Sequence, residues 1–388
     1  MVKIETSEPG LHGVGCATFT QRLTAVRTVV DDYLQPLLIG RDPHRIEDIW
    51  QLVYQNAYWR NGPVLNNALS GVDQALWDIK GKVAGLPLYE LLGGKVREGA
   101  ATYDHADGRD PEELLDRVLQ LQEAGLRHIR CQVRGYAGPG ADGSTAEVEG
   151  QPGVVPTFDR SAYLRSLPRL FEFLRGRLDE DLELLHDVHE RVTPTEAVRL
   201  ARELEPFRLF FLEDPLAPED LGWLGNLRRA STTPIAIGEL FTHPLEWRGI
   251  IARQELDFIR VHISDIGGIT PARKLVALAE AFGVRTAFHG PADVSPVGHA
   301  ANVHLDVSAP SFGIQEFTGF SEALREVFPG APERRDGALH PGDGPGLGVD
   351  IDEQLAERYP LHPDLAQFRA GVVEWTQSRL PDGSLIRP

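Results

Sequence analysis

Three short apolar runs in the middle of the chain end in an acidic residue, and the three acids are evenly spaced. Residues 184–187, 211–213 and 235–239 end in Asp187, Glu213 and Glu239, so each acid follows the one before it by 26 residues. Such an interval accommodates one strand, one helix and two loops, the repeat of a parallel sheet with helical crossovers. The spacing therefore predicts three successive parallel strands with their carboxylates at the same height, at the carboxyl ends.

Polar residues continue this series toward the C-terminus. Asp265, His289 and Glu316 follow at intervals of 26, 24 and 27 residues. Between about residues 101 and 317, helical patterns such as 194–203 and 271–281 alternate with short apolar runs. These runs predict strands at 129–133, 182–186, 209–212, 235–237, 258–263, 286–288 and 314–317. The alternation favours an α/β fold with a parallel sheet, and its length suits a TIM-like barrel.

The chemistry of such strand ends follows from the residue types. A barrel carries its active site at the carboxyl ends of its strands, and a cluster of carboxylates suits Mg²⁺ better than zinc. His189 lies two residues after Asp187, so on an extended strand both side chains would point into the same site. A histidine beside a cation is a candidate general acid or base, and the alternative is a hydrogen-bonded structural histidine.

Two further stretches carry candidate substrate contacts. Arg260 and His262 alternate in the same manner, and Arg260 could bind a substrate carboxylate or form a salt bridge at the edge of the core. His289 precedes Gly290–Pro291, a rigid turn, and Asp293 and His299 follow closely. At least one of these polar residues is expected to be functional.

Composition excludes several classes of protein. Of 388 residues, 42% are hydrophobic and 25% charged, as in an ordinary globular chain. The net charge of −18 opposes binding to nucleic acid or to anionic membranes. The two cysteines, Cys16 and Cys131, are too few for a disulfide framework, which favours a reducing, cytoplasmic compartment. The sequence offers neither a secretion signal nor an apolar stretch of about 20 residues for a membrane span.

The two ends of the chain differ from its middle. A strand pair around Pro9–Gly10 and helices at 24–38, 46–59 and 65–83 are predicted before Gly93–Gly94. Residues 135–156 and 329–348 are rich in Gly and Pro, and the first of these is long enough for a functional loop. We therefore divide the chain into 1–100, a barrel at 101–328, and a closing segment at 329–388.

Eight short motifs make the chain similar to the enolase superfamily, specifically to the mannonate dehydratase group with its galactonate-dehydratase-like and starvation-sensing members. They are IGRDP (39–43), ALWDIK (75–80), LLGG (91–94), YDHADG (103–108), LHDVH (185–189), LEDP (212–215), IGE (237–239) and FHGP (288–291). The resemblance covers nearly the whole length. It implies a modified (β/α)₇β barrel beneath an α+β capping domain that is built from both chain ends.

The resemblance also implies roles for individual residues. Asp187, Glu213 and Glu239 would ligate Mg²⁺, and His189 would be an acid/base group. The residues that would contact an acid sugar are His105, Arg260, His289, Asp293 and Glu316, with Glu239 beside them. The metal would bind the substrate carboxylate and stabilise the enediolate left by removal of the C2 proton, and the 3-hydroxyl would then leave. The implied product is a 2-keto-3-deoxy sugar acid, and the implied assembly is a homo-oligomer.

The chain departs from the family pattern at the expected base. Family members with this activity pair an arginine with a tyrosine twelve residues later, whereas here Arg130 is followed at that distance by Asp142. The nearest tyrosine is Tyr136, six residues after Arg130. Either Tyr136 serves as the base, with its pKa lowered beside Arg130, or the base is missing.

Further departures concern the capping segments, where the superfamily selects its substrates. Thr20 stands where the family commonly has asparagine, residues 382–388 lack the family's tryptophan, and the family begins one strand before Val2. The pocket wall has therefore changed, and the choice among mannonate, gluconate and other aldonates stays open.

Three hypotheses follow. The first is an Mg²⁺-dependent acid-sugar dehydratase. The second is another enolase-type reaction, racemisation or epimerisation, with His289 as a base that Asp265 orients. The third is a binding or sensing protein that kept the metal site but lost the base, as the altered Arg130 spacing suggests.

Overall fold

The computed structural model describes residues 1–134, 158–360 and 378–386. The chain forms two compact units. The first unit comprises Met1–Thr102, Gly238–Ala252 and Ile259–Leu361, and the second comprises Tyr103–Ile237, Arg253–Phe258 and His362–Pro388. Tyr136, Asp142 and the rest of the Gly/Pro-rich segment 135–156 lie outside the described residues. In the part of the chain that is described, no helix is long and apolar enough to cross a membrane.

The first unit begins with the predicted hairpin and helices. Strands β1 (Val2–Glu5) and β2 (His12–Gly15) pair antiparallel, and α3 (Ile46–Asn56) and α4 (Pro63–Ala84) match the predicted helices closely. The predicted helix 24–38 is present as three pieces, α1 (Leu23–Thr28), a π-helical turn η2 (Val29–Leu34) and α2 (Gln35–Leu38). Helix α4 begins at Pro63 and is capped at its C-terminus by Gly85, whose backbone is left-handed. Proline is common at the first position of a helix and glycine just after its end.

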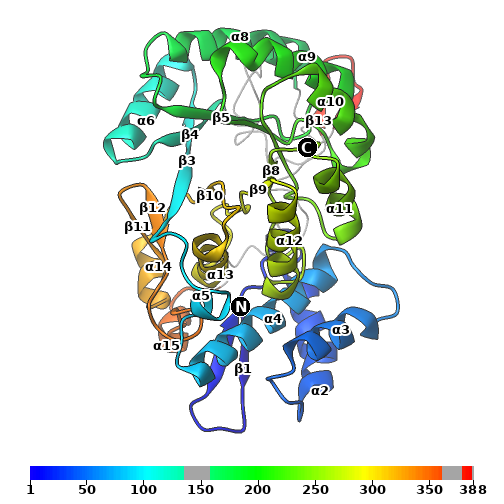
Figure 1. The fold of residues 1–388 in the computed structure, drawn as a ribbon, viewed down its shortest axis with the longest axis vertical. Coiled ribbons are helices and arrows are strands. Elements are labelled where there is room, and N and C mark those ends of the chain that lie inside the picture. The colour runs from blue at the N-terminus through cyan, green and yellow to red at the C-terminus, as the bar shows by residue number, and fades with distance from the viewer. Residues whose placement is uncertain (135–157, 361–377, 387–388) are drawn as a thin grey trace. The chain divides into compact units, whose positions relative to one another are not determined.

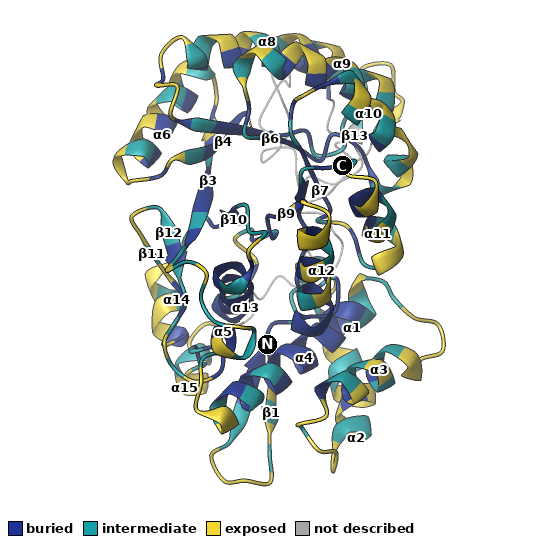
Figure 2. Ribbon diagram, viewed as in Figure 1, coloured by how far each residue is buried: buried dark blue, intermediate teal, exposed yellow. Residues whose placement is uncertain are grey.

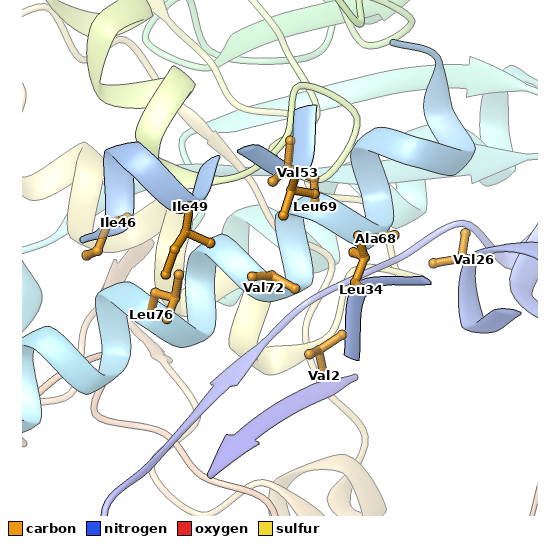
Figure 3. Packing of buried hydrophobic residues seen from close by; sticks show 10 residues of the cluster. All are labelled: Val2, Val26, Leu34, Ile46, Ile49, Val53, Ala68, Leu69, Val72 and Leu76. Atoms are coloured by element: carbon orange, nitrogen blue, oxygen red, sulfur yellow. The ribbon is translucent and has the colours of Figure 1, made fainter. Parts of the chain in front are cut away.

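Packing around α4 forms one hydrophobic core of this unit. Figure 3 shows side chains of α3 and of the hairpin directed at α4, with the residues Val2, Val26, Leu34, Ile46, Ile49, Val53, Ala68, Leu69, Val72 and Leu76. The Asp78 side chain of the same helix is fully buried and accepts hydrogen bonds from the N–H groups of Val14 (3.1 Å) and Leu347 (2.8 Å). Lys82 Nζ lies 2.7 Å from Asp78 Oδ2, so the buried carboxylate is satisfied by three partners.

The remaining elements of the first unit come from later in the chain. They are α5 (Leu88–Leu91), α11 (Pro244–Ala252), α12 (Ile269–Ala281), β9 (Arg285–Thr286), α13 (Pro296–Ser308), β10 (Gln315–Glu316), α14 (Glu322–Val327), β11 (Glu333–Arg335), β12 (Ala338–His340) and α15 (Glu353–Ala356). Helix α13 was not predicted, because Pro296–Val307 is buried on all sides and has no polar face to give a helical period.

The second unit contains the alternating strands and helices that the sequence predicts. Its sheet runs in the order β3 (Ala100–Gly108), β4 (His128–Val133), β5 (Glu183–Asp187), β6 (Phe211–Glu213), β7 (Ile235–Ile237) and β8 (Phe258–Ile259), and β3 to β7 are parallel. The helices are α6 (Pro111–Glu123), α8 (Arg160–Arg175), α9 (Pro194–Leu204) and α10 (Leu224–Ala230). Figure 1 shows α6, α8 and α9 on one side of β4 and β5, and Figure 2 shows that these strands are buried while the helices carry exposed residues. A short pair, β13 (Ser378–Arg379) and β14 (Leu385–Ile386), completes the unit.

The strand register confirms the predicted height for two of the three acids and corrects the third. Asp187 and Glu213 are direct partners across β5 and β6. Glu213, however, is opposite Ala236 on β7, not Glu239. The reason is that β7 ends at Ile237 and Gly238 turns the chain with a φ of 135°, so that Glu239 lies beyond the strand.

Asp265 is not a strand end either. Strand β8 stops at Ile259, and the N–H of Asp265 donates to the carbonyl of His262 in a turn (3.0 Å). The residue interval alone could not detect this, because a turn before helix α12 occupies the length that the prediction gave to the strand.

Candidate active site

Three buried carboxylates gather at the carboxyl ends of β5 and β6. Asp187, Glu213 and Asp214 each offer an oxygen atom, and these atoms lie within 4.8 Å of one another. Asp187 ends β5, Glu213 ends β6, and Asp214 follows with a φ of 37°. That left-handed turn brings two adjacent acids to one site. The sequence prediction included Asp187 and Glu213 but missed Asp214, whose only signal was its place in the LEDP motif.

Strands β3 and β4 bring basic and aromatic groups to the same carboxylates. Arg130 Nη1 donates to Asp187 Oδ2 (3.3 Å), and Arg130 Nη2 lies 3.1 Å from His105 Nδ1, which therefore accepts. His105 and Arg130 are register partners across the two strands, which explains why the two predicted substrate residues meet. The hydroxyl of Tyr103, a fully buried residue that the prediction did not single out as a functional residue, donates to Glu213 Oε2 (3.4 Å).

His189 is adjacent to this cluster but does not lie on an extended strand. Its φ is 51°, and β5 has already ended at Asp187, so the predicted strand alternation is wrong. The cause is a pair of main-chain hydrogen bonds to the next strand end, from Val188 N–H to Glu213 (3.0 Å) and from Glu190 N–H to Asp214 (2.9 Å). The turn still ties His189 to Asp187, because the N–H of His189 donates to Asp187 Oδ1.

A second layer of polar residues holds β5 in place. His186, one residue before Asp187, points to the opposite face of the strand, as alternation requires. Its Nδ1 donates to the carbonyl of Cys131 and its Nε2 accepts from the hydroxyl of Tyr163, both at 2.8 Å. Burial lowers the pKa of His186 to about 4, so the ring is neutral at pH 7. Gln132 Nε2 also donates to the carbonyl of Asp187 (3.3 Å).

The first unit contains a second cluster of predicted site residues, around Arg260. This guanidinium is fully buried, and its Nη2 donates to Glu316 Oε2 (3.1 Å) and to Glu239 Oε2 (3.4 Å). His289 Nε2 lies 3.4 Å from Glu239 Oε2 and 3.9 Å from Glu316 Oε2. The pKa of His289 is lowered, because the effect of burial outweighs that of the carboxylates of Glu239 and Glu316, which raise it. The N–H of Gly290 donates to Glu316 Oε2 (2.9 Å), which fixes the turn after His289.

Other predicted residues of this unit have different partners. Thr20 Oγ1 donates to Asp293 Oδ2 (3.3 Å), so these two capping and loop residues do meet. His262 Nδ1 accepts from the N–H of Ser264 (3.1 Å), and its ring centroid is 5.3 Å from that of His289. Asp265 Oδ1 accepts from the amide of Asn67 (2.6 Å) and makes no hydrogen bond with His289. The predicted pairing of Asp265 with His289 is therefore wrong.

The donor set at Asp187, Glu213 and Asp214 fits a hard metal ion. Oxygen ligands are the ones that Mg²⁺ prefers. Arg130 offsets one of the three negative charges that the cluster gathers in a buried place, and a divalent cation would offset the others. Glu239, the third ligand that the resemblance implies, belongs to the first unit, where Arg260 and His289 are its partners.

Carboxylates at the ends of consecutive parallel strands that could hold a hard metal are the arrangement found at the active-site face of TIM-like barrel enzymes. The chain belongs to the enolase superfamily. The family described as "Enolase C-terminal domain-like" matches residues 114–355, and the mandelate racemase/muconate lactonizing enzyme N-terminal domain matches residues 1–93. The fold is accordingly an N-terminal capping domain plus a TIM-like barrel, as the sequence predicted.

Similar proteins and structures span nearly the whole chain. D-galactonate dehydratase family members from Musicola paradisiaca and Pantoea ananatis are each 53% identical, with 100% of this chain and 95% of theirs covered. A crystal structure of an enolase from Pantoea ananatis, with bound D-gluconate and Mg, has a TM-score of 0.92 at 53% identity, over 100% of this chain and 95% of that one. An enolase described as a putative galactarate dehydratase from Agrobacterium radiobacter, bound to Na and L-malate, has a TM-score of 0.82 at 26% identity, with the same coverage.

Proposed function

We propose that the protein catalyses the Mg²⁺-dependent dehydration of an acid sugar, an aldonate such as D-mannonate or D-gluconate, to a 2-keto-3-deoxy sugar acid. The observation that carries the proposal is the buried carboxylate cluster at the ends of β5 and β6, with His189 directly after it. The D-galactonate dehydratase family relatives and the D-gluconate and Mg of the Pantoea ananatis structure support the choice of acid sugar and metal.

Mg²⁺ would be held by Asp187 and Glu213, which have Asp214 beside them, and Glu239 is the third ligand that the resemblance implies. When bound, it would supply Lewis-acid stabilisation of the negative charge that develops on the substrate carboxylate as the C2 proton leaves. The guanidinium groups of Arg130 and Arg260, both buried, would hold anionic or hydroxyl oxygens of the substrate. Burial makes these contacts stronger than they would be in water.

His189 would transfer the proton in the elimination. The bond from its N–H to Asp187 holds the backbone of His189 beside the carboxylate cluster. A general acid at this place can protonate the 3-hydroxyl as it departs. Loss of the C2 proton and of the 3-hydroxyl, the latter as water, gives the enol of the 2-keto-3-deoxy product.

Tyr136 is the candidate for the base at C2, and it lies outside the described residues. Arg130, six residues earlier, is buried at the site. Proximity of a guanidinium would lower the phenol pKa toward neutrality. Tyr136→Phe should then abolish exchange of the C2 proton with solvent deuterium while Mg²⁺ affinity stays the same.

The deciding experiment is a turnover screen of the purified protein with Mg²⁺ against a library of aldonates and aldarates, read out as 2-keto acid. A product from any aldonate supports the dehydratase, and its loss on chelation with EDTA ties the reaction to the metal. If no compound of the library gives a 2-keto acid, although calorimetry shows that the protein binds Mg²⁺, the proposal is overturned.

A sensing or binding role is the second candidate, favoured by Asp142 at the place of the usual tyrosine. It predicts tight, Mg²⁺-dependent binding of an acid sugar without turnover. Equilibrium binding measured on the same library separates the two functions, because a turned-over ligand would be consumed during the titration.

A further inference from the structure

The loop that carries Glu239 is anchored at its far end by residues from the first hundred of the chain. Glu239 follows Gly238 and precedes the fully buried Phe241, whose N–H donates to the carbonyl of Gly238 (3.0 Å). The next residue, Thr242, is where the loop meets α4. All of these residues belong to the first unit.

Asn66, in the first turns of α4, holds this anchor point. Its side-chain Nδ2 lies 2.9 Å from the carbonyl of Thr242 and 2.6 Å from the carbonyl of Asp265, and the side chain is buried. A third acceptor, Asn61 Oδ1, lies at 3.0 Å, and Asn61 Nδ2 in turn donates to Thr242 Oγ1 (3.0 Å). One amide group thus joins the main chain of two loops, the one after Glu239 and the one after His262.

Other side chains also form hydrogen bonds with these two loops, in addition to the amide of Asn66. Glu246 Oε2 accepts from the N–H groups of Thr242 and His243, both at 2.7 Å. In the second loop, Asn67 donates to Asp265 Oδ1 and Trp50 Nε1 donates to the carbonyl of Gly267 (2.9 Å). Asn66 is the residue that spans the two loops directly.

We propose that Asn66 is a positioning residue for Glu239: it fixes the main chain at Thr242, three residues after the carboxylate, and thereby sets where that carboxylate can stand. The proposal rests on the proposed function in taking Glu239 as a ligand of Mg²⁺. An amide N–H shared among buried carbonyl groups is directional, and its loss leaves those acceptors without their donor. Without this anchor the loop would sample a wider range of positions, so that Glu239 is less well placed to ligate Mg²⁺.

The test compares Asn66→Ser with Asn56→Ser, an exposed asparagine at the end of α3. We expect Asn66→Ser to raise the Kd for Mg²⁺, measured by calorimetry without substrate, by about 10-fold, as losses behind a metal ligand commonly do. Hydrogen exchange of residues 239–246 and 262–268 should become faster in the same variant. Turnover should recover at saturating Mg²⁺, whereas a purely structural role would lower Tm and leave the Kd of the folded fraction unchanged.

The outcomes separate the inference from the proposed function. Faster exchange with a raised Kd supports both. Exchange that stays unchanged, or faster exchange with an unchanged Kd, overturns the positioning role. Wild-type protein that binds no Mg²⁺ overturns the proposed function and, with it, the role of Asn66 toward the metal, while the exchange data still report whether the anchor exists. If Asn66→Ser does not fold, Asn61→Gly replaces it, since glycine adopts the φ of 77° found there.

Discussion

The main-chain N–H of His189 donates a hydrogen bond to Oδ1 of Asp187 at 2.8 Å. This bond closes the turn in which His189 has a left-handed φ, and it joins the candidate acid/base residue to a candidate metal ligand. The position of the imidazole therefore depends on the backbone and on Asp187, not on a strand that would carry both side chains on one face. A substitution of His189 can remove the imidazole without disturbing this turn.

His189→Asn is the matched substitution, because asparagine tolerates the left-handed region better than most residues. We expect kcat on the acid sugar to fall by about 100-fold or more, the usual loss for a general acid, with little change in Tm. Glu190→Asn is the control, since Glu190 also has a positive φ of 61°. Steady-state kinetics and thermal unfolding of both variants check this, and unchanged kcat in His189→Asn would refute the acid/base role.

Asp187→Asn and Glu213→Gln should each abolish stabilisation of the protein by Mg²⁺. A ligand at 100 times its Kd adds about 2.7 kcal/mol to the free energy of unfolding, so the wild-type Tm should rise with Mg²⁺. The variants should show no such rise, because a neutral amide is a weaker ligand for a hard cation. Glu112→Gln, on an exposed position of α6, is the control and should respond like the wild type. A Mg²⁺-induced rise in Tm in both cluster variants would contradict the assignment of these ligands.

Glu316→Gln should destabilise the first unit. Its carboxylate is buried and pairs with the fully buried guanidinium of Arg260 at 3.1 Å. Removing one partner of a buried ion pair typically lowers the free energy of unfolding by about 3–5 kcal/mol. Because Arg260 would keep its contact with Glu239, we expect a loss near the lower end of this range. Urea unfolding measures the loss, with the exposed Glu322→Gln as the reference. Equal stability of the two variants would show that the pair does not carry this energy.

We expect the free energy of unfolding to depend on pH between about pH 4 and 7 because of Asp73. Burial raises the pKa of this carboxyl to about 7, even though it accepts a hydrogen bond from the N–H of Thr270 (2.9 Å). The unfolded chain loses the proton near pH 4, whereas the folded protein keeps it until about pH 7. The group therefore lowers the free energy of unfolding progressively as pH rises from 4 to 7, by on the order of 4 kcal/mol.

Asp73→Asn removes this dependence because an amide does not titrate in that range. The difference in unfolding free energy between variant and wild type should shift in favour of the variant from pH 5 to pH 7 and then level off. Urea unfolding at pH 5, 6, 7 and 8 measures it. A difference that is constant over this range would mean that Asp73 has an ordinary pKa in the folded state.

Spacing predicted the strands well because a strand, a helix and two loops have a nearly fixed total length. The predicted strands 182–186 and 209–212 end one residue before β5 and β6 do, and the prediction that Asp187 and Glu213 lie at strand ends is confirmed. The interval carries no information about where a strand stops within its repeat. For that reason the predictions for Glu239 and Asp265 are wrong, since β7 ends at Ile237, before the turn at Gly238, and β8 ends at Ile259.

The unpredicted parts of the site depend on local backbone geometry and on buried polar pairs. Asp214 joins Glu213 because of a positive φ, which no apolar pattern signals. His186 and Tyr163 meet through contacts that the alternation of apolar residues does not encode. The roles of the individual site residues remain predictions, whereas the superfamily and its fold are confirmed by similarity over the whole chain.

Asp78 has a consequence for how the protein is made. Its buried carboxylate needs the N–H of Val14 and also that of Leu347, which lies 269 residues later in the chain. At a synthesis rate of about 5–20 residues per second, the second donor leaves the ribosome roughly a quarter of a minute to a minute after Asp78. Asp78 therefore gains its last buried donor only late in translation, after residues 103–237, the largest part of the second unit, have been synthesised. A nascent chain that stops short of residue 347 would leave the carboxylate of Asp78 without one of its two main-chain donors, which makes its burial in α4 costly.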